Sequence, residues 1–325
     1  MKKFLSVLGT AVLIVSVLIG CGNTKNTDTS VTTGSVAEEN EAETAGETGT
    51  RTVSTIKGDI EVPENPQRVV ANWYVGEVIT LGLNLVGYNA WEQESMPFYE
   101  ELLDSAKIDS WEPENVMTLE PDLIITYSEE DFDKFSKIAP VLVIPEDIEP
   151  TERLLVLGEA AGKEEEAKAA VDTFTTKLAE AKEVLKGESF EGKTFSIMED
   201  WGPSGEWSGV YYETGSRGGT VVYEYLGLAM PEKLTELIEE TGEGRGSISY
   251  EVAHEYFGDY ILWFQQEGKE SEYAKTEIWK SIPAVQEGRV AEIPGEMLGL
   301  FYYSDVTSLT EQLDYIVNAI NSLIK

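Results

Sequence analysis

Short apolar runs alternate with longer amphipathic stretches along most of the chain, and this order is typical of an α/β fold. The apolar runs lack a polar face, which favours strands buried on both sides in a parallel sheet. The amphipathic stretches are apolar on one side only, as surface helices are. The predicted strands are 68–71, 85–88, 122–126, 141–144, 193–198, 260–264 and 289–293. The predicted helices are 75–81, 151–161, 163–186, 219–226, 273–280 and 306–324, with an aromatic, glycine-rich loop at 201–219.

One stretch of sequence occurs twice in pattern, as Glu114–Ile125 and again as Glu251–Leu262. In each copy a Glu opens a short helical turn, an Asp follows eight residues later, and an apolar run then forms a predicted strand. A Leu-Gly-Leu triplet precedes each copy, at Leu81–Leu83 and at Leu226–Leu228. A repeat this long predicts two α/β lobes of like topology rather than a short-period solenoid.

A stretch without Pro or Gly, 163–186, separates the two copies and predicts a long connecting helix. The expected fold class is therefore α/β, with two Rossmann-like lobes on parallel sheets, joined by one long α-helix, and with a ligand cleft between the lobes. The expected domains are a lipoprotein signal peptide at 1–20, a disordered tether at 21–55, an N-terminal α/β lobe at 56–150, connecting helices at 151–188 and a C-terminal α/β lobe at 189–325.

The N-terminus has the features of a secretory signal, with two lysines followed by the apolar run Phe4–Ile19. Leu18-Ile19-Gly20-Cys21 resembles the bacterial lipobox, which implies that the thiol of Cys21 is acylated and becomes the mature N-terminus. The alternative is a cleaved signal with an incidental cysteine. Because Cys21 is the only cysteine, this chain can form neither an internal disulfide nor a thiolate metal site.

The charge balance is strongly acidic, with 24 Lys and Arg against 60 Asp and Glu and a formal net charge of −36. Such a surface repels nucleic acid and has no polybasic patch for a membrane. It also disfavours a highly anionic ligand, unless local arginines override the field. The sole histidine, His254, lies in the repeated helical segment, so a hydrolase built on a catalytic histidine has little support.

Aromatic residues gather where loops are expected to leave the strands, and in open α/β sheets ligands bind beyond the carboxyl ends of the strands. Each residue alone could belong to the core, but their recurrence in both lobes favours a flat-sided aromatic pocket. The candidate aromatic residues are Trp73, Trp91, Trp111, Tyr127, Trp201, Trp207, Tyr211, Tyr302 and Tyr303. Arg217 and Arg245 lie in glycine-rich settings, where each guanidinium could donate to an anionic oxygen or form a surface pair instead.

Two glutamates, Glu114 and Glu251, open the matching segments and should occupy equivalent places on the two lobes. A carboxylate near the start of a helix is good capping chemistry, which is one explanation. The other is that a symmetric pair of exposed carboxylates suits a partner presenting arginines from two related subunits.

With a lipobox, a tether, two lobes and a long helix, the chain resembles the helical-backbone (class III) substrate-binding lipoproteins of ABC transporters, the siderophore and cobalamin group. The resemblance rests on three stretches, Val62–Val70, Leu119–Ile125 and Gly258–Ile261. It implies that Glu114 and Glu251 dock onto arginines of the permease.

Three further stretches are most similar to the Gram-positive ferric-hydroxamate-binding lipoproteins; they are Ser216–Tyr223, Ile278–Ser281 and Phe301–Asp305. This resemblance implies that Arg217 and the aromatic residues Tyr127, Tyr302 and Tyr303 hold an iron-hydroxamate complex. The chain departs from that pattern at Gly215, where these proteins often carry Trp, and Trp201 or Trp207 could replace it.

The resemblance therefore implies a receptor, not an enzyme, held by the lipid on Cys21 at the outer face of the cell membrane. It would capture a ferric siderophore, with the hydroxamate type favoured, and deliver it to an ABC permease dimer with its ATPase. No cofactor is expected and no metal is bound directly, because the siderophore holds the iron; the protein is expected to be a monomer. Ferric citrate-type siderophores, haem and cobalamin are alternative ligands, and a siderophore-ester hydrolase or a surface adhesion module are alternative functions.

Overall fold

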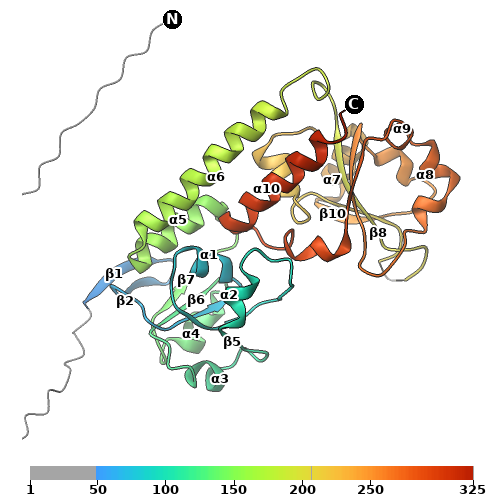
Figure 1. Ribbon diagram of the computed structural model, residues 1–325. Helices are drawn as coiled ribbons and strands as arrows, with labels where there is room; N and C mark the ends of the chain where they lie inside the picture. Colours follow the sequence, from blue (N-terminus) through green and yellow to red (C-terminus); the bar gives the residue numbers. More distant parts are fainter. Residues whose placement is uncertain (1–48, 206, 325) are drawn as a thin grey trace, which may run out of the picture. The chain divides into compact units, whose positions relative to one another are not determined.

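The computed structural model describes residues 49–205 and 207–324 and contains two α/β lobes, each with a five-stranded sheet (Figure 1). The predicted signal peptide, the lipidation site at Cys21 and most of the predicted tether lie outside the described residues. Within the described ranges, no helix is both long enough and apolar enough to span a membrane.

The first lobe contains an antiparallel β-hairpin and an all-parallel sheet of strand order β5-β4-β3-β6-β7. Strands β3 and β6 are buried at every position, as their unbroken apolar runs predict. The strands are β1 (Thr50–Thr55), β2 (Gly58–Pro63), β3 (Val69–Asn72), β4 (Leu85–Asn89), β5 (Ala106–Lys107), β6 (Leu123–Thr126) and β7 (Val141–Val143). The helices are α1 (Val75–Thr80), α2 (Tyr99–Leu103), α3 (Pro113–Met117) and α4 (Glu130–Phe135).

The second lobe has a mixed sheet of strand order β10-β9-β8-β11-β12. Strands β8, β11 and β12 are parallel, whereas β9 and β10 are antiparallel to their neighbours. The strands are β8 (Phe195–Asp200), β9 (Val210–Glu213), β10 (Arg245–Ile248), β11 (Tyr260–Phe264) and β12 (Val290–Ile293). The helices are the π-helix η1 (Thr220–Tyr225), α7 (Glu232–Thr241), the 3-10 helix η2 (Ala253–Tyr256), the 3-10 helix η3 (Tyr273–Lys275), α8 (Glu277–Ser281), α9 (Pro283–Gln286), the 3-10 helix η4 (Gly295–Gly299) and α10 (Val306–Asn321).

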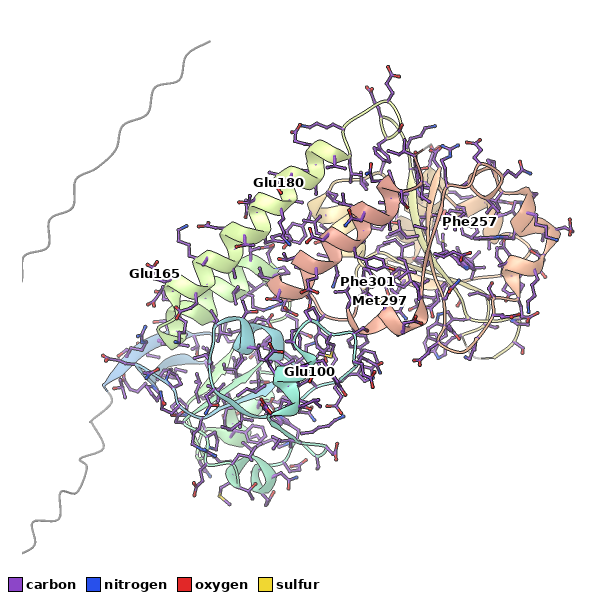
Figure 2. The ribbon with its side chains drawn as sticks, viewed as in Figure 1. Glu100, Glu165, Glu180, Phe257, Met297 and Phe301 are labelled. Carbon is purple, nitrogen blue, oxygen red and sulfur yellow. The ribbon has the colours of Figure 1, made fainter. Side chains whose placement is uncertain are left out.

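Two helices connect the lobes, α5 (Pro150–Ala161) and the longer α6 (Glu164–Val184). Pro150 at the first helical position and the Glu149 carboxylate, which accepts from the backbone N–H of Thr151 and Glu152, start α5. Helix α6 packs against both α5 and α10 (Figure 1), and the labelled side chains of Glu165 and Glu180 project away from that contact (Figure 2). At 21 residues, α6 is about 31 Å long, the long helix that the sequence predicts.

The sequence repeat is also a repeat of structure. Asp122 accepts hydrogen bonds from the backbone N–H groups of Gln67 and Arg68, just before β3, at 2.7 and 2.9 Å. In the second lobe Asp259 accepts from the backbone N–H of Thr194, just before β8, at 3.0 Å. In both lobes the repeated aspartate thus fixes the start of the central strand, which confirms the predicted likeness of the lobes.

The two Leu-Gly-Leu triplets also have one structural role. Gly82 follows α1 with a φ of 64°, and Gly227 follows η1 with a φ of 70°. These positive angles suit glycine, which has no Cβ to clash with the backbone. Each triplet therefore ends a helix and turns the chain back towards its sheet.

The predicted end of the tether at residue 55 is wrong, because strand β1 of the β1–β2 hairpin already starts at Thr50. Thr50 and Thr52 donate to the Glu61 carboxylate at 2.9 and 2.7 Å across the hairpin. Arg51 donates to the backbone carbonyl of Glu159, near the end of α5, at 2.9 Å. Cross-strand hydrogen bonds thus order a stretch that has too few apolar residues to be recognised as a strand.

The prediction of parallel sheets in both lobes is wrong for the second lobe, because β9 pairs antiparallel with β8. Strand β9 lies inside the stretch 201–219 that was predicted to be a loop. Its four residues are all buried. Val210 and Tyr212 pack into a separate apolar core within the second lobe, and Tyr211 and Glu213 lie on the opposite face of the sheet. Neighbouring glycines and aromatic residues hide this alternation in the sequence. Two predicted helices also differ, since 219–226 forms a π-helix and 273–280 divides into η3 and α8.

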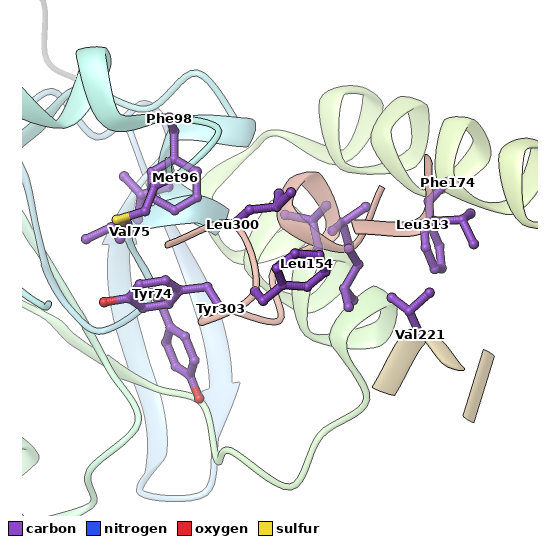
Figure 3. Packing of buried hydrophobic residues seen from close by; sticks show 14 of the residues in the cluster. Tyr74, Val75, Met96, Phe98, Leu154, Phe174, Val221, Leu300, Tyr303 and Leu313 are labelled. Atoms are coloured by element: carbon purple, nitrogen blue, oxygen red, sulfur yellow. The ribbon is translucent and has the colours of Figure 1, made fainter. Parts of the chain in front are cut away.

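The largest apolar core contains residues from both lobes and from the connecting helices (Figure 3). Phe98 of the first lobe, Phe174 of α6 and Leu313 of α10 are each at most 2% exposed. Phe301 and Met297 lie in the segment that leads to α10 (Figure 2), and Phe301 is 1% exposed. Burial of this continuous apolar surface is the main contribution to the stability of the two-lobed body.

A cluster of charged side chains, the buried charge cluster (Glu77, Arg153 and Asp305), lies within this core. Arg153 of α5 pairs with Glu77 of α1 at 2.7 Å and donates to the backbone carbonyl of Ser304 at 3.1 Å. Asp305 caps α10 by accepting from the backbone N–H of Ser308 at 2.9 Å. Burial raises the pKa of Glu77 against the attraction of Arg153, and it also raises the pKa of Asp305.

Replacing Arg153 with Met should lower the free energy of unfolding by about 3–5 kcal/mol, the range for removing one partner of a buried ion pair. Glu77 and Asp305 would then carry uncompensated charge in the core. A carboxyl group whose pKa is raised by folding contributes most to stability at low pH, and that contribution is lost as the pH rises. The loss of unfolding free energy in Arg153→Met, relative to the wild type, should therefore grow as the pH rises. Urea denaturation of both proteins over roughly pH 4 to 8 measures this difference.

The matched control is Lys168→Met, which removes an exposed partner of Asp172 on α6. An exposed pair contributes little, so this variant should unfold like the wild type at every pH. Equal unfolding curves for the Arg153 and Lys168 variants would contradict the role given to the buried charge cluster.

Candidate functional site

Three of the predicted tryptophans follow strands at the sheet edge where parallel strands end. Trp73 comes directly after β3, Trp201 directly after β8, and Trp91 two residues after β4. The backbone N–H of Trp73 donates to the carbonyl of Asn89 at 2.9 Å, which extends the pairing of β3 and β4 beyond the sheet. The placement confirms that these tryptophans lie at the carboxyl ends of strands.

Four aromatic residues, Trp73, Trp91, Tyr302 and Tyr303, form an aromatic wall that both lobes share. The ring of Tyr302 lies 4.1 Å from that of Trp91 and 5.8 Å from that of Trp73, between ring centroids. Tyr303 lies 5.1 Å from Trp73 and donates its hydroxyl to the backbone carbonyl of Trp91 at 2.5 Å. Burial raises the pKa of Tyr303, so its hydroxyl stays protonated and holds the two lobes together. The half-buried ring of Tyr302 remains partly open to a ligand.

Backbone strain is concentrated near this wall. Among the described residues only three other than glycine have a positive φ, namely Trp73 at 73°, Arg217 at 58° and Glu120 at 46°. Such angles are costly for residues with a Cβ, and they persist where the surrounding structure enforces them. Two of the three are predicted site residues, and strain of this kind is common at binding sites.

Arg217 is placed by two interactions. Its backbone N–H donates to the carbonyl of Phe301 at 3.1 Å, directly before Tyr302. Its side-chain Nε donates to the Glu199 carboxylate at 2.8 Å, and the side chains are 13% and 7% exposed. In the described part of the chain, no hydrogen bond from the Nη groups of Arg217 occurs, so they can donate to a ligand.

The strand pair β8–β9 completes this side of the site. Tyr211 lies opposite Glu199 in the β-ladder, and its ring stacks on that of Trp201 with a centroid distance of 5.1 Å. Burial raises the pKa of Tyr211. Glu213, on the same face as Tyr211, accepts from the backbone N–H groups of Thr214 and Gly215 and so shapes the turn that leads to Arg217.

The remaining predicted site residues have other surroundings. Trp111 donates its indole N–H to Asp131 at 2.9 Å and packs on the separate apolar core of the first lobe. Trp207 is 58% exposed and Tyr127 is 37% exposed. Arg245 is exposed on β10, where it lies opposite Glu213. Within the described residues, no aromatic ring pair or hydrogen bond joins these four residues to the aromatic wall.

Two small cavities flank the segment that carries Tyr302 and Tyr303. One of about 70 Å³ is lined by Trp73, Tyr303 and the buried charge cluster. Another of about 190 Å³ is lined by Tyr302, Tyr303, Ser216 and the turn at Gly215. A larger cavity of about 760 Å³ lies in the second lobe, between the loops after β8 and β11, with Trp201 on its wall. The small cavities are lined by residues of the aromatic wall, whereas the large one is lined by none of them and contains Trp201, which stacks on Tyr211.

The sequence did not single out Glu199 or Glu213, which position Arg217 and its turn. Both glutamates are buried, and each directly follows an apolar or aromatic residue in a strand that is buried at every position. A charged residue at an inward position of a buried strand is the signal that could have identified them.

The two repeated glutamates are both exposed. Glu114 lies in the first turn of α3, and Glu251 lies in the turn before η2. Hydrogen bonds within the turn, including one from the Ser249 side chain, lower the pKa of Glu251 and keep it ionised. His254 is also exposed, which agrees with a solvated helix histidine.

Comparisons with known proteins give relatives along nearly the whole chain. The iron(3+)-hydroxamate-binding protein YxeB of Bacillus subtilis (strain 168) is 33% identical over 98% of this chain and 97% of its own length. The iron(3+)-hydroxamate-binding protein FhuD of the same organism is 31% identical over 95% of both chains.

A solved structure shares the fold. It is a periplasmic binding protein component of a Fep/Fec-like ferrichrome ABC transporter from Bacillus subtilis, with a TM-score of 0.67 and 29% identity over 82% of this chain and 98% of that one. The family model described as periplasmic binding protein matches residues 86–297. The chain therefore belongs to the periplasmic binding protein family, the substrate-binding components of ABC transporters.

Proposed function

We propose that this protein is an extracytoplasmic, lipid-anchored receptor that captures a ferric siderophore of the hydroxamate type and delivers it to an ABC permease dimer with its ATPase. The observation that carries the proposal is the guanidinium of Arg217, whose Nη groups make no hydrogen bond within the described residues. The backbone N–H of Arg217 bonds to the carbonyl of Phe301, directly before Tyr302 of the aromatic wall. The names of the two curated relatives support the choice of hydroxamates. The protein binds its ligand without converting it, and it acts as a monomer.

Hydroxamate complexes suit this combination of groups. A ferric trihydroxamate presents polar oxygens around the metal and apolar linkers elsewhere, and its charge is low. The rings of Trp73, Trp91 and Tyr302 can cover the linkers, while Arg217 donates to the oxygens. The siderophore supplies every iron ligand, so the protein needs no metal-binding side chain of its own.

Delivery requires a second surface, and Glu114 and Glu251 are suited to it. Both are exposed, and both stand eight residues before the aspartate that fixes the central strand of their lobe. Two carboxylates at equivalent positions match a permease made of two related subunits that each present arginines.

Arg217→Ala should weaken binding of an iron-loaded trihydroxamate by about 1.5–3 kcal/mol, the range for a hydrogen bond to a charged group. Tyr302→Phe should cost less, since it removes a hydroxyl and keeps the ring. Quenching of tryptophan fluorescence during titration with iron-loaded and iron-free siderophores measures the affinities, and thermal melting checks that each variant is folded.

A competing placement of the site is tested alongside by Arg245→Ala. Wild-type affinity in Arg217→Ala, together with a loss in Arg245→Ala, would move the site towards β10. Binding of iron-free ligand as tight as that of the iron-loaded complex would contradict a siderophore receptor.

Replacing both Glu114 and Glu251 with Ala should leave siderophore affinity intact and abolish cellular uptake. Each single replacement should impair uptake less, because the other lobe still presents a carboxylate to its own subunit. If the glutamates only cap helical turns, the variants should instead lose about 0.5–2 kcal/mol of stability per site and transport normally at matched protein levels. Affinity, melting temperature and uptake measured on the same three variants separate these outcomes.

Cys21→Ala should release the protein from the membrane fraction and leave the affinity of the soluble body unchanged. Acylation of the lone cysteine after Leu18-Ile19-Gly20 would supply the hydrophobic anchor, and the substitution removes the acylated thiol. Membrane fractionation with immunodetection measures the distribution. A variant still bound tightly to membranes would show that the anchor lies elsewhere.

A further inference from the structure

The guanidinium in the proposed site is charge-compensated by a carboxylate buried behind it. Glu199, at 6% exposure, accepts from Nε of Arg217 at 2.8 Å, which occupies one edge of the guanidinium. The Nη groups on the remaining side have no partner within the described chain. Arg217 can therefore donate hydrogen bonds to a ligand while adding little net positive charge to the site.

The other charged groups near Arg217 do not restore an excess of positive charge. Glu213 lies on the same sheet face as Glu199, and Arg245 lies opposite it on the neighbouring strand, so these two neighbours together add no net charge. Across the site, the 70 Å³ cavity beside Trp73 is lined by Glu77, Asp305 and Glu146 but by only one arginine, Arg153. The site thus combines hydrogen-bond donors with a neutral to negative field.

We infer that Glu199 determines the charge preference of the binding site. By cancelling the charge of Arg217 and leaving its donors open, it admits neutral and cationic ferric complexes and disfavours anionic complexes of the citrate type. This inference rests on the proposed function and narrows its substrate class by charge.

The physical reason is the cost of removing an anion from water. An anionic ferric complex loses hydration on entering a partly buried site, and only a nearby net positive charge offsets that loss. The Glu199–Arg217 pair is dipolar and supplies no such charge. A neutral hydroxamate oxygen loses less hydration, so hydrogen bonds from the Nη groups suffice to hold it.

Glu199 could instead serve only to orient Arg217. Glu199→Gln separates the two roles, because the amide oxygen still accepts from Nε while the negative charge is gone. If orientation alone mattered, this substitution would change the affinities of all ligands by one common factor. If the charge of Glu199 matters, Glu199→Gln would change the ratio of the affinities for ligands of different charge.

The experiment compares three iron complexes by fluorescence titration: ferrioxamine B, which carries a protonated amine; its neutral N-acetylated form with the same chelate; and ferric citrate prepared with excess citrate. The wild type should bind both hydroxamates and disfavour ferric citrate. In Glu199→Gln the affinity for ferric citrate relative to the neutral hydroxamate should rise by about tenfold or more. The reason is that the guanidinium of Arg217 is then an uncompensated unit charge, which attracts the anion at an effective dielectric constant of roughly 20. The preference for ferrioxamine B over its acetylated form should fall.

Three further variants make the result specific. Glu240→Gln removes the same charge from an exposed position on α7 and should leave the ligand ratios unchanged. The double variant with Glu199→Gln and Arg217→Gln should lose the gain for ferric citrate, because the uncompensated guanidinium is its source. Glu199→Asp, which keeps the charge, should keep the wild-type order of ligands and covers the case in which the Gln variant is unstable.

The outcomes separate this inference from the function on which it rests. Hydroxamate binding with ligand ratios that Glu199→Gln leaves unchanged would overturn the inference and leave the proposed function standing. A wild type that prefers ferric citrate, or binds none of the three complexes, would overturn both. If Glu240→Gln changes the affinity ratios between the complexes as much as Glu199→Gln does, the effect comes from the net charge of the protein, and the role of Glu199 is overturned.

Discussion

The ion pair between Arg153 and Glu77 constrains how the segments of the two-lobed body are arranged around the apolar core. It joins α5 to α1 in the interior, and the same guanidinium holds the carbonyl of Ser304, next to the Asp305 that caps α10. Three segments far apart in sequence therefore meet at one buried cation. Each buried carboxylate needs that cation nearby, so the arrangement of the segments is fixed more narrowly than apolar packing alone would fix it.

The geometry of the binding site follows from this anchorage. Tyr302 and Tyr303 directly precede the anchored Ser304, and the Tyr303 hydroxyl bonds to the carbonyl of Trp91 in the first lobe. On the other side Arg217 is tied to the carbonyl of Phe301. The strained backbone of Trp73 and Arg217 is tolerated because the parts on either side are already held, and a site built in this way is pre-organised for its ligand.

The acidic composition and the chemistry of the site agree with each other. A chain with a formal net charge of −36 repels anions at long range, and at short range Glu199 cancels the main cation of the site. What remains for recognition is aromatic surface and directed hydrogen-bond donors. Such a site discriminates by shape and by the placement of oxygens rather than by attraction between net charges.

The sequence by itself determined the two-lobed α/β body, since the repeat of Glu114–Asp122 as Glu251–Asp259 and the buried strands depend on local periodicity. It also identified Arg217 and the residues of the aromatic wall as site candidates. Only the tertiary structure decided that Trp111 bonds to Asp131, that β9 turns part of a predicted loop into a strand, and that Glu199 pairs with Arg217. Periodicity shows which face a residue occupies, but these pairings depend on strand order and on turns between distant segments, which no local pattern specifies.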